Sequence, residues 1–311
     1  MRVSPEGLIL GVVLDALLGD PRRGHPVAGF GRAAMWLEKR TYGDSRARGA
    51  LFAGVLVGGA GALGLALGSL GRGRVSRALV TAGATWAVLG GTSLGREGQF
   101  MARALESGDL EGARGRLSHL CARDPRGLGA DELARATVES LAENTSDAAI
   151  APLVWGAVAG VPGLFVYRAV NTLDAMVGYR SARYVRFGWA AARLDDAANW
   201  VPARVTGLLT VLCSGSGESW RVLRRDGGKH PSPNAGRCEA AFAGALGVRL
   251  GGTNSYGGLV ERRPEMGDGR APRVGDVRRA VRLSARVTFA AAVLAAGTAA
   301  VAAAAAARGR R

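Results

Sequence analysis

The sequence predicts an all-α integral membrane protein, and three uncharged apolar runs carry this prediction. The runs cover residues 50–70, 78–94 and 287–307. A helix rises about 1.5 Å per residue, so roughly 20 residues cross the hydrocarbon of a bilayer. Three such runs are difficult to bury in the core of a soluble protein. We therefore expect a single membrane-embedded domain over residues 1–311, with transmembrane helices at these three runs.

Other apolar runs are expected to enter the membrane only in part. Residues 148–167 carry no charge, but they contain Pro152 and the sequence GVPG at residues 160–163. Proline and glycine break a helix there, which predicts a re-entrant hairpin. Residues 205–212 are too short for a span and suit an interfacial or buried helix. The predicted fold is thus all-α and polytopic, with three transmembrane helices and up to three partial or re-entrant ones.

The charge balance suggests an anionic partner. The chain has 41 Lys and Arg residues against 25 Asp and Glu residues, a formal charge of +16. The arginines are scattered around the apolar runs instead of forming one basic arm, which argues against nucleic acid. A membrane surface or a phosphorylated or carboxylated substrate fits better. The three cysteines are far apart and lack CxxC spacing, so neither a zinc-thiolate site nor a disulfide framework is predicted.

Four polar segments, at residues 19–49, 95–147, 168–200 and 216–286, are expected to be largely helical and to carry the chemistry. The first contains GDPRRGHPV, in which Asp20, Arg22 and His25 follow an apolar helix. A turn at this point would present a carboxylate, guanidinium groups and an imidazole together. An ordinary interfacial turn with snorkelling arginines is the alternative interpretation.

A second motif, ESLAENTSDAAIAP, places carboxylates at regular helical spacing. Glu139, Glu143 and Asp147 are four residues apart, so a helix would put them on one face. Asn144 would lie beside them. Carboxylates at that spacing repel one another, and a bound cation such as Mg²⁺ or a neighbouring arginine would reduce this repulsion. A solvated acidic helix face is the alternative.

The third segment mixes carboxylates, carboxamides and guanidinium groups over residues 167–204. Its candidate side chains are Arg168, Asn171, Asp174, Arg180, Arg193, Asp195, Asp196 and Asn199. Oxygen ligands hold a hard divalent ion and guanidinium groups pair with phosphate, so this mixture suits nucleotide or diphosphate chemistry. Internal salt bridges would give the same composition. The chain has no P-loop motif GxxxxGK[ST].

The fourth motif is HPSPN, which places His230 and Asn234 in a polar loop framed by prolines. Residues 239–248 then predict a helix. Residues 251–256, which include Asn254, predict a second, glycine-rich loop whose backbone donors can approach an anion. A plain turn is the default interpretation of this glycine-rich stretch.

Taken together, the motifs resemble a known family. They are GDPRRGHPV, ESLAENTSDAAIAPL, YRAVNTLDAMVGYR, FGWAAARLDDAANWVPAR and HPSPNAGRCEAAFAGALGVRLGG, in this order between residues 19 and 252. From about residue 7 to residue 258 the chain closely resembles the adenosylcobinamide-phosphate synthase (cobinamide synthase) family of cobalamin biosynthesis. The resemblance implies that aminopropanol, or its O-phosphate, is joined as an amide to the propionate carboxylate of adenosylcobyric acid.

The resemblance implies ATP and Mg²⁺ as co-substrates and no prosthetic group. A carboxylate does not condense with an amine in water, so ATP must first activate it. The catalytic candidates are His25, Glu143, Asp147, Asp174, Asp195, Asp196 and His230, with Asp147, Asp174, Asp195 and Asp196 as candidate Mg²⁺ ligands. The substrate- and phosphate-binding candidates are Asp20, Arg22, Asn144, Arg168, Asn171, Arg180, Arg193, Asn199, Asn234 and Asn254.

The implied partners are a corrinoid, aminopropanol phosphate and the lipid bilayer, with no nucleic acid and no predicted oligomeric state. The protein is expected to cross the cell membrane several times, with its active segments on the cytosolic side, where ATP is present. Two alternatives compete with this interpretation. One is an intramembrane Mg²⁺-dependent prenyl-type transferase. Asn171, Asp174 and the pair Asp195–Asp196 superficially resemble the aspartate-rich, Mg²⁺-binding helices of such enzymes. The other is a non-enzymatic corrinoid carrier, which would favour charges inside the spans.

Overall fold

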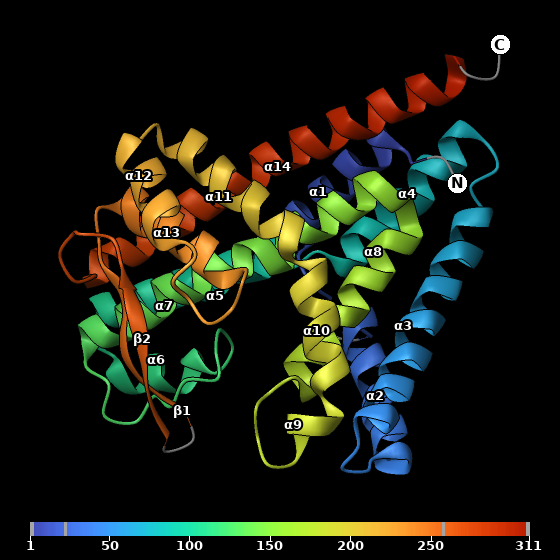
Figure 1. The fold of residues 1–311 in the computed structure, drawn as a ribbon. Helices are drawn as coiled ribbons and strands as arrows, with labels where there is room; N and C mark the ends of the chain where they lie inside the picture. The colour runs from blue at the N-terminus through green and yellow to red at the C-terminus, as the bar shows by residue number, and fades with distance from the viewer. Residues whose placement is uncertain (1–2, 22–23, 257–258, 309–311) are drawn as a thin grey trace. The chain divides into compact units, whose positions relative to one another are not determined.

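The computed structural model describes residues 3–21, 24–256 and 259–308, with the backbone alone for residues 254–260 and 306. Helices and one two-stranded sheet make up the fold (Figure 1). By internal contacts the chain divides into two compact units. Unit 1 is Met1–Gly90, Ala151–Asn199 and Ala291–Arg311, and unit 2 is Gly91–Ile150 and Trp200–Ala290. The single membrane-embedded domain expected from the sequence stays a prediction.

Four helical stretches of the described chain are long and apolar enough to cross a membrane, which confirms the all-α polytopic class. They are Arg46–Ser69, Arg74–Glu106, Ala130–Val177 and Val274–Ala305. The predicted spans at residues 50–70 and 287–307 correspond to α3 (Arg46–Ser69) and α14 (Val274–Arg308). The predicted span at residues 78–94 is not one regular helix. Here α4 (Arg74–Val88) ends because Leu89 takes extended backbone, with ψ 153°, and α5 (Gly91–Glu106) follows.

Unit 1 is built around α8 (Ala151–Val177), against which α3 and α4 pack. The first helix, α1 (Pro5–Leu18), lies along α4, and α2 (Pro26–Thr41) contacts α8. Two short helices follow α8, namely α9 (Tyr184–Phe187) and α10 (Trp189–Ala198). Phe52 of α3, Leu173 of α8 and Phe187 of α9 are buried in one hydrophobic core. This core holds α10 against α8, which positions the polar groups described below.

The predicted break within residues 148–167 is present as a sharp bend in α8. Gly160 has φ 66° and ψ −148°, a conformation that glycine alone adopts readily. A Cβ placed on Gly163 would lie 2.3 Å from the carbonyl oxygen of Trp155. In a straight helix, residues eight positions apart would be separated by roughly 12 Å. The chain therefore turns back on itself at Gly160. A re-entrant path through the membrane stays a prediction.

Replacing Gly160 with Ala is expected to destabilise the protein by about 1–3 kcal/mol, because a Cβ strains this backbone conformation. The apparent melting temperature of the detergent-solubilised protein should fall. Gly58→Ala is the matched control, since a Cβ at Gly58 in α3 meets nothing within 4 Å. That substitution should leave the melting temperature unchanged or raise it. Equal melting temperatures for the two variants would contradict a strained bend at Gly160.

Unit 2 is built around α7 (Ala130–Thr145), which continues into one π-helical turn, η1 (Ser146–Ile150). The other helices of the unit are α5, α6 (Leu110–Leu117), α11 (Trp200–Ser214), α12 (Gly217–Asp226), α13 (Ala235–Leu246) and the first part of α14. The apolar helix α11 is shorter than a span, as predicted for residues 205–212. The helix predicted at 239–248 is α13. It begins four residues earlier and ends at Gly247, whose φ of 66° gives a left-handed cap.

The glycine-rich stretch at residues 251–256 is a strand, and the loop predicted there is wrong. Strand β1 (Leu250–Tyr256) pairs in antiparallel fashion with β2 (Leu259–Met266). The register shifts between Leu250 and Gly252, where Gly251 has φ 91°. A Cβ on Gly251 would lie 2.2 Å from the carbonyl oxygen of Pro264. The glycine therefore permits a β-bulge instead of marking a loop.

Candidate functional sites

Unit 1 holds a connected set of polar side chains on α8 and α10. Asn171 donates to Asp195 Oδ1 at 3.3 Å, and Asn199 donates to Asp195 Oδ2 at 3.0 Å. The hydroxyl of Tyr167 donates to Asn199 Oδ1 at 2.9 Å. Arg168 Nη1 lies 3.4 Å from Asn171 Oδ1. We call these five residues the Asp195 network.

Helical spacing places the members of the Asp195 network beside one another. Arg168 and Asn171 are three residues apart on α8, and Asp195 and Asn199 are four apart at the end of α10. Burial raises the pKa of Asp195 to about 6, and the neighbouring charge of Asp196 raises it further, against the hydrogen bonds from the two asparagines. A carboxyl group with this pKa exchanges a proton close to physiological pH, which suits a general base.

Three arginines were predicted to bind phosphate, and they have different surroundings. Arg168 Nε donates to the carbonyl oxygen of Val88 at 2.7 Å. This guanidinium therefore supplies a hydrogen-bond donor to a carbonyl group at the C-terminal end of α4, which has no partner within the helix. Arg193 is exposed on α10 and pairs with Asp196 at 3.2 Å. Arg180 is exposed in the connection between α8 and α9. Arg180 and Arg193 therefore reach solvent, whereas Arg168 is tied to backbone.

Two further predicted groups of unit 1 lie at helix ends. His25 caps α2, because its Nδ1 accepts the Val27 N–H at 3.1 Å, and its Nε2 lies 3.5 Å from Asp20 Oδ1. The structure thus brings Asp20 and His25 together. The predicted Arg22 lies outside the described residues. Asp174 lies in the last turn of α8, and a Cβ on Gly178 would lie 1.9 Å from its Oδ1.

Unit 2 contains a buried ion-pair cluster that we call the Glu139 cluster, formed by Arg123, Arg135 and Glu139. Glu139 is 6% exposed and pairs with Arg123, and its Oε1 lies 3.6 Å from Arg135 Nη1. Oε1 also accepts the Gly251 N–H at 2.7 Å. Arg135 donates to the carbonyl oxygen of Thr253 at 2.9 Å. The cluster therefore attaches the β-hairpin to α7.

His230 is buried next to a second carboxyl group of unit 2. Its Nε2 lies 3.9 Å from Glu239 Oε1 and 3.0 Å from Arg263 Nη1. Burial and the charge of Arg263 lower the pKa of His230 to about 4, so the imidazole is neutral at pH 7. Burial, together with the charges of Glu139 and Glu143, raises the pKa of Glu239 well above its ordinary value. A neutral histidine and a carboxyl group that resists ionisation thus lie side by side.

The carboxylates predicted to share one face, at residues 139, 143 and 147, belong to two consecutive helical segments. The helix α7 ends at Thr145, and Asp147 lies in the π-helical turn η1. Burial raises the pKa of the Cys238 thiol, and the charges of Asp147 and Glu143 raise it further, so both carboxylates lie near α13. Asn144 Nδ2 donates to the carbonyl oxygens of Leu120 and Ser140, at 3.2 and 2.8 Å. This asparagine anchors the connection that precedes α7.

The remaining amide candidates of unit 2 lie near its connections. Asn234 precedes α13, and its Oδ1 accepts a hydrogen bond from Arg204 Nη1 at 3.4 Å. The side chain of Asn254 lies outside the described residues, although its backbone pairs with Glu261 in the hairpin.

The metal candidates do not form a cage. Among the described residues, no group of three or more His, Cys, Asp and Glu side chains could hold a metal ion. Of the predicted ligands, Asp147 belongs to unit 2, and Asp174, Asp195 and Asp196 belong to unit 1.

Five residues of these clusters were not predicted from the sequence, namely Arg123, Arg135, Tyr167, Glu239 and Arg263. Tyr167 ends an apolar run. A buried tyrosine hydroxyl normally has a hydrogen-bond partner, so its position in the sequence could have indicated a polar neighbour. Glu239 is the one acidic residue in the helix 235–246, which otherwise consists of alanine, glycine, phenylalanine and leucine apart from Arg237 and Cys238. A carboxyl group in such a helix is rarely buried without a polar neighbour.

Comparison with known proteins identifies the family. The model of the CobD/Cbib protein family matches residues 8–284. The chain is 56% identical over 294 residues to a cobalamin biosynthesis protein CobD of Mycobacterium tuberculosis (strain CDC 1551 / Oshkosh), covering 93% of this chain and 94% of that relative. It is 45% identical over 273 residues to CobD of Geobacter metallireducens, covering 84% and 86%. No solved structure matches the chain. The chain therefore belongs to the CobD/Cbib family of cobalamin biosynthesis proteins.

Proposed function

We propose that this protein is an adenosylcobinamide-phosphate synthase. It uses ATP to join aminopropanol, or its O-phosphate, to the propionate carboxylate of adenosylcobyric acid. Membership of a cobalamin biosynthesis family supports the pathway. The observation that carries the proposed chemistry is the Asp195 network, in which two carboxamides hold a carboxyl group with a pKa of about 6.

The reaction needs an activated acid and a base. ATP phosphorylates the carboxylate, so that phosphate becomes the leaving group. The amine nitrogen then attacks the carbonyl carbon, the C–N bond forms, the C–O bond to phosphate breaks and the nitrogen loses a proton. Asp195 accepts this proton, because at pH 7 it is mostly ionised yet more basic than an ordinary aspartate. Asn171 and Asn199 fix the orientation of its carboxylate.

The phosphate groups require cations. Arg180 and Arg193 are exposed on unit 1 and can pair with phosphate oxygens through two N–H groups. Asp174 and Asp196 would each supply a ligand to the Mg²⁺ that accompanies ATP, which neutralises phosphate charge when bound. Arg168 is assigned a positioning role, since it contacts both Val88 and Asn171.

The proposal is tested with purified protein, adenosylcobyric acid, aminopropanol phosphate, ATP and Mg²⁺. Mass spectrometry should detect the amide product, and leaving out ATP should abolish it. Corrinoid binding without amide formation would favour the carrier alternative. Consumption of a prenyl diphosphate, with no amide product, would favour the transferase alternative.

The pH dependence of kcat/KM is expected to show an acid limb near pH 6. Below this pH Asp195 is protonated and cannot accept the proton, so the rate should rise with pH through about 6. Asp196→Asn removes a charge that raises the pKa of Asp195, and the limb should move to lower pH. Asn171→Leu removes a hydrogen bond to the ionised form, and the limb should move to higher pH. A limb that both substitutions leave in place would exclude Asp195 as its source.

A further inference from the structure

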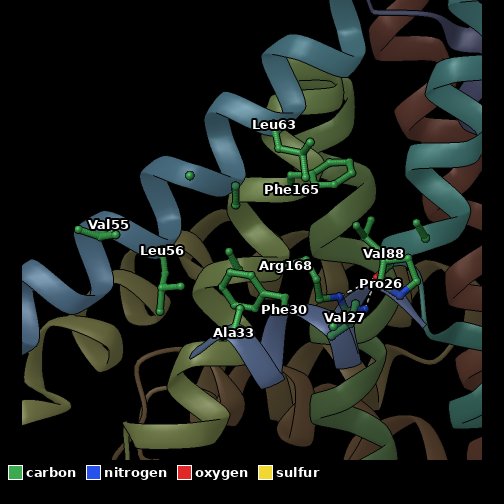
Figure 2. Close-up of a pocket in the computed structure, with 15 residues that line it drawn as sticks. Pro26, Val27, Phe30, Ala33, Val55, Leu56, Leu63, Val88, Phe165 and Arg168 are labelled. Atoms are coloured by element: carbon green, nitrogen blue, oxygen red, sulfur yellow. Dashed lines mark hydrogen bonds between the residues drawn. The ribbon is translucent and has the colours of Figure 1, made fainter. Parts of the chain in front are cut away.

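Unit 1 contains an apolar pocket with a volume of ≈ 380 Å³. Helices α2, α3 and α8 and the end of α4 line it. Figure 2 shows Phe30 of α2, Leu56 and Leu63 of α3 and Phe165 of α8 among the lining side chains. Arg168 is the one charged residue of the lining. Ligand pockets in proteins have similar volumes, about 300–1,000 Å³, and similarly apolar walls.

The pocket opens along the exposed side of a candidate membrane span. Only 22% of the most apolar window of α3 is buried. Val55 and Leu63 belong to the pocket lining and are 54% and 51% exposed. In a bilayer this face of α3 contacts hydrocarbon chains instead of water. A lipid chain that enters the pocket gains dispersion contacts that an empty apolar cavity lacks.

Cationic and aromatic side chains on α2 point to the headgroup of such a lipid. Arg32 is exposed, and its Nη2 lies 3.8 Å from the position of a Cβ on Gly29, a residue of the pocket lining. One turn further along α2, Trp36 is 57% exposed, and the guanidinium of Arg40 lies 3.9 Å from the centroid of its ring. Exposed tryptophan is typical of the membrane–water interface, where arginine attracts anionic headgroups.

We propose that this pocket binds one acyl chain of an anionic phospholipid, with the lipid phosphate next to Arg32. The lipid chain covers the part of the pocket wall where Arg168 donates to the Val88 carbonyl, the hydrogen bonds drawn in Figure 2. The proposal does not rest on the ligase reaction, since it concerns the lipid-facing walls of α2 and α3. According to this proposal, one lipid binds at a specific site on the protein, in addition to the lipids that surround the membrane-spanning helices.

The test uses the full chain in phosphatidylcholine nanodiscs that contain a trace of phosphatidylglycerol with a diazirine at the end of one acyl chain. After irradiation, mass spectrometry should place the label on peptides that contain the pocket residues. Gly59→Leu should lower this labelling several-fold, because Gly59 lines the pocket and a Cβ there meets nothing within 4 Å. Gly58→Leu is the matched control. A Cβ at Gly58 is equally unobstructed, and the residue is not part of the lining.

Two further variants keep the test decisive. Ala33→Phe fills the pocket from α2 and should lower the labelling as Gly59→Leu does. Arg32→Gln should reduce labelling by the phosphatidylglycerol probe to the level of a phosphatidylcholine probe with the same acyl chain. Equal pocket labelling in the Gly58→Leu and Gly59→Leu proteins would overturn the acyl-chain site. Equal labelling of the unmodified protein by the two probes would overturn the anionic headgroup.

Discussion

Asp195→Asn is expected to lower kcat for amide formation by about 10²–10⁴-fold, the range found when a general base is lost. Asparagine has nearly the same shape as aspartate and can still take part in hydrogen bonds with Asn171 and Asn199, but it cannot accept the proton of the amine. Single-turnover measurement of amide formation at pH 8 would show the loss directly, because unsubstituted Asp195 is ionised there.

The stability of the Asp195→Asn protein should not explain that loss. The folded-state pKa of Asp195 is raised, so the carboxyl group favours the folded state at low pH, and this contribution disappears as the pH rises through about 6. At pH 8 the asparagine variant should therefore melt at the same or a higher temperature. Asp44→Asn is the control, because Asp44 forms an exposed ion pair with Arg186 on the same unit. A kcat similar to that of the Asp44→Asn protein would rule Asp195 out as the base.

Glu139→Gln is expected to cause the largest loss of stability, about 3–5 kcal/mol. The substitution leaves the guanidinium of Arg123, whose side chain is 5% exposed, without its carboxylate partner. It also weakens the contact of α7 with Gly251 in the hairpin. The apparent melting temperature should fall by on the order of 10 °C.

The matched control for this prediction is Glu111→Gln, whose carboxylate is 85% exposed and pairs with Arg114. Exposed pairs contribute about 0–1 kcal/mol, so the control should melt close to the unsubstituted protein. Replacing Arg123 and Glu139 together with leucine should restore part of the stability, because the guanidinium of Arg123 is then no longer buried without the Glu139 carboxylate. A Glu139→Gln protein that melts like the Glu111→Gln protein would contradict a stabilising role for the Glu139 cluster.

Hydropathy predicts the helices of this protein better than it predicts their ends. The spans within α3 and α14 follow from composition alone, because uncharged runs of that length require a helix in lipid. The run at residues 78–94 is also uncharged, although the mean hydropathy of its stretch is 1.2 against 2.1 for Arg46–Ser69, and it is broken where Leu89 becomes extended. Nothing in hydropathy marks that residue. The bend at Gly160 could be predicted because glycine and proline affect the backbone locally.

The β-hairpin could not be predicted because its partners are distant in sequence. Gly251 and Gly252 indicate a loop when they are considered alone. They become a bulged strand because β2 supplies hydrogen-bond partners and Arg135 and Glu139 bind the backbone. The strand propensity of residues 251–256 reflects neither the pairing with β2 nor the contacts with Arg135 and Glu139.

The residue types of the candidate site could be predicted from the sequence, but their contacts could not. Asn171, Asp195 and Asn199 were identified as polar residues in one segment, and the structure joins them in one network. The hydrogen bond from Arg168 to the Val88 carbonyl could not be predicted, because it forms where the end of α4 approaches α8. Such an approach of two helices depends on tertiary packing, which the residue types of one segment do not specify.

The most direct test of the proposed ligation follows the carboxylate oxygen. Adenosylcobyric acid carrying ¹⁸O in its propionate carboxylate is converted with ATP, Mg²⁺ and aminopropanol phosphate, and the ATP-derived products are analysed by mass spectrometry. If ATP activates the carboxylate as an acyl phosphate, the phosphate released with each amide carries ¹⁸O from the corrinoid. Amide formation with no ¹⁸O in any ATP-derived product would contradict activation of the carboxylate by ATP.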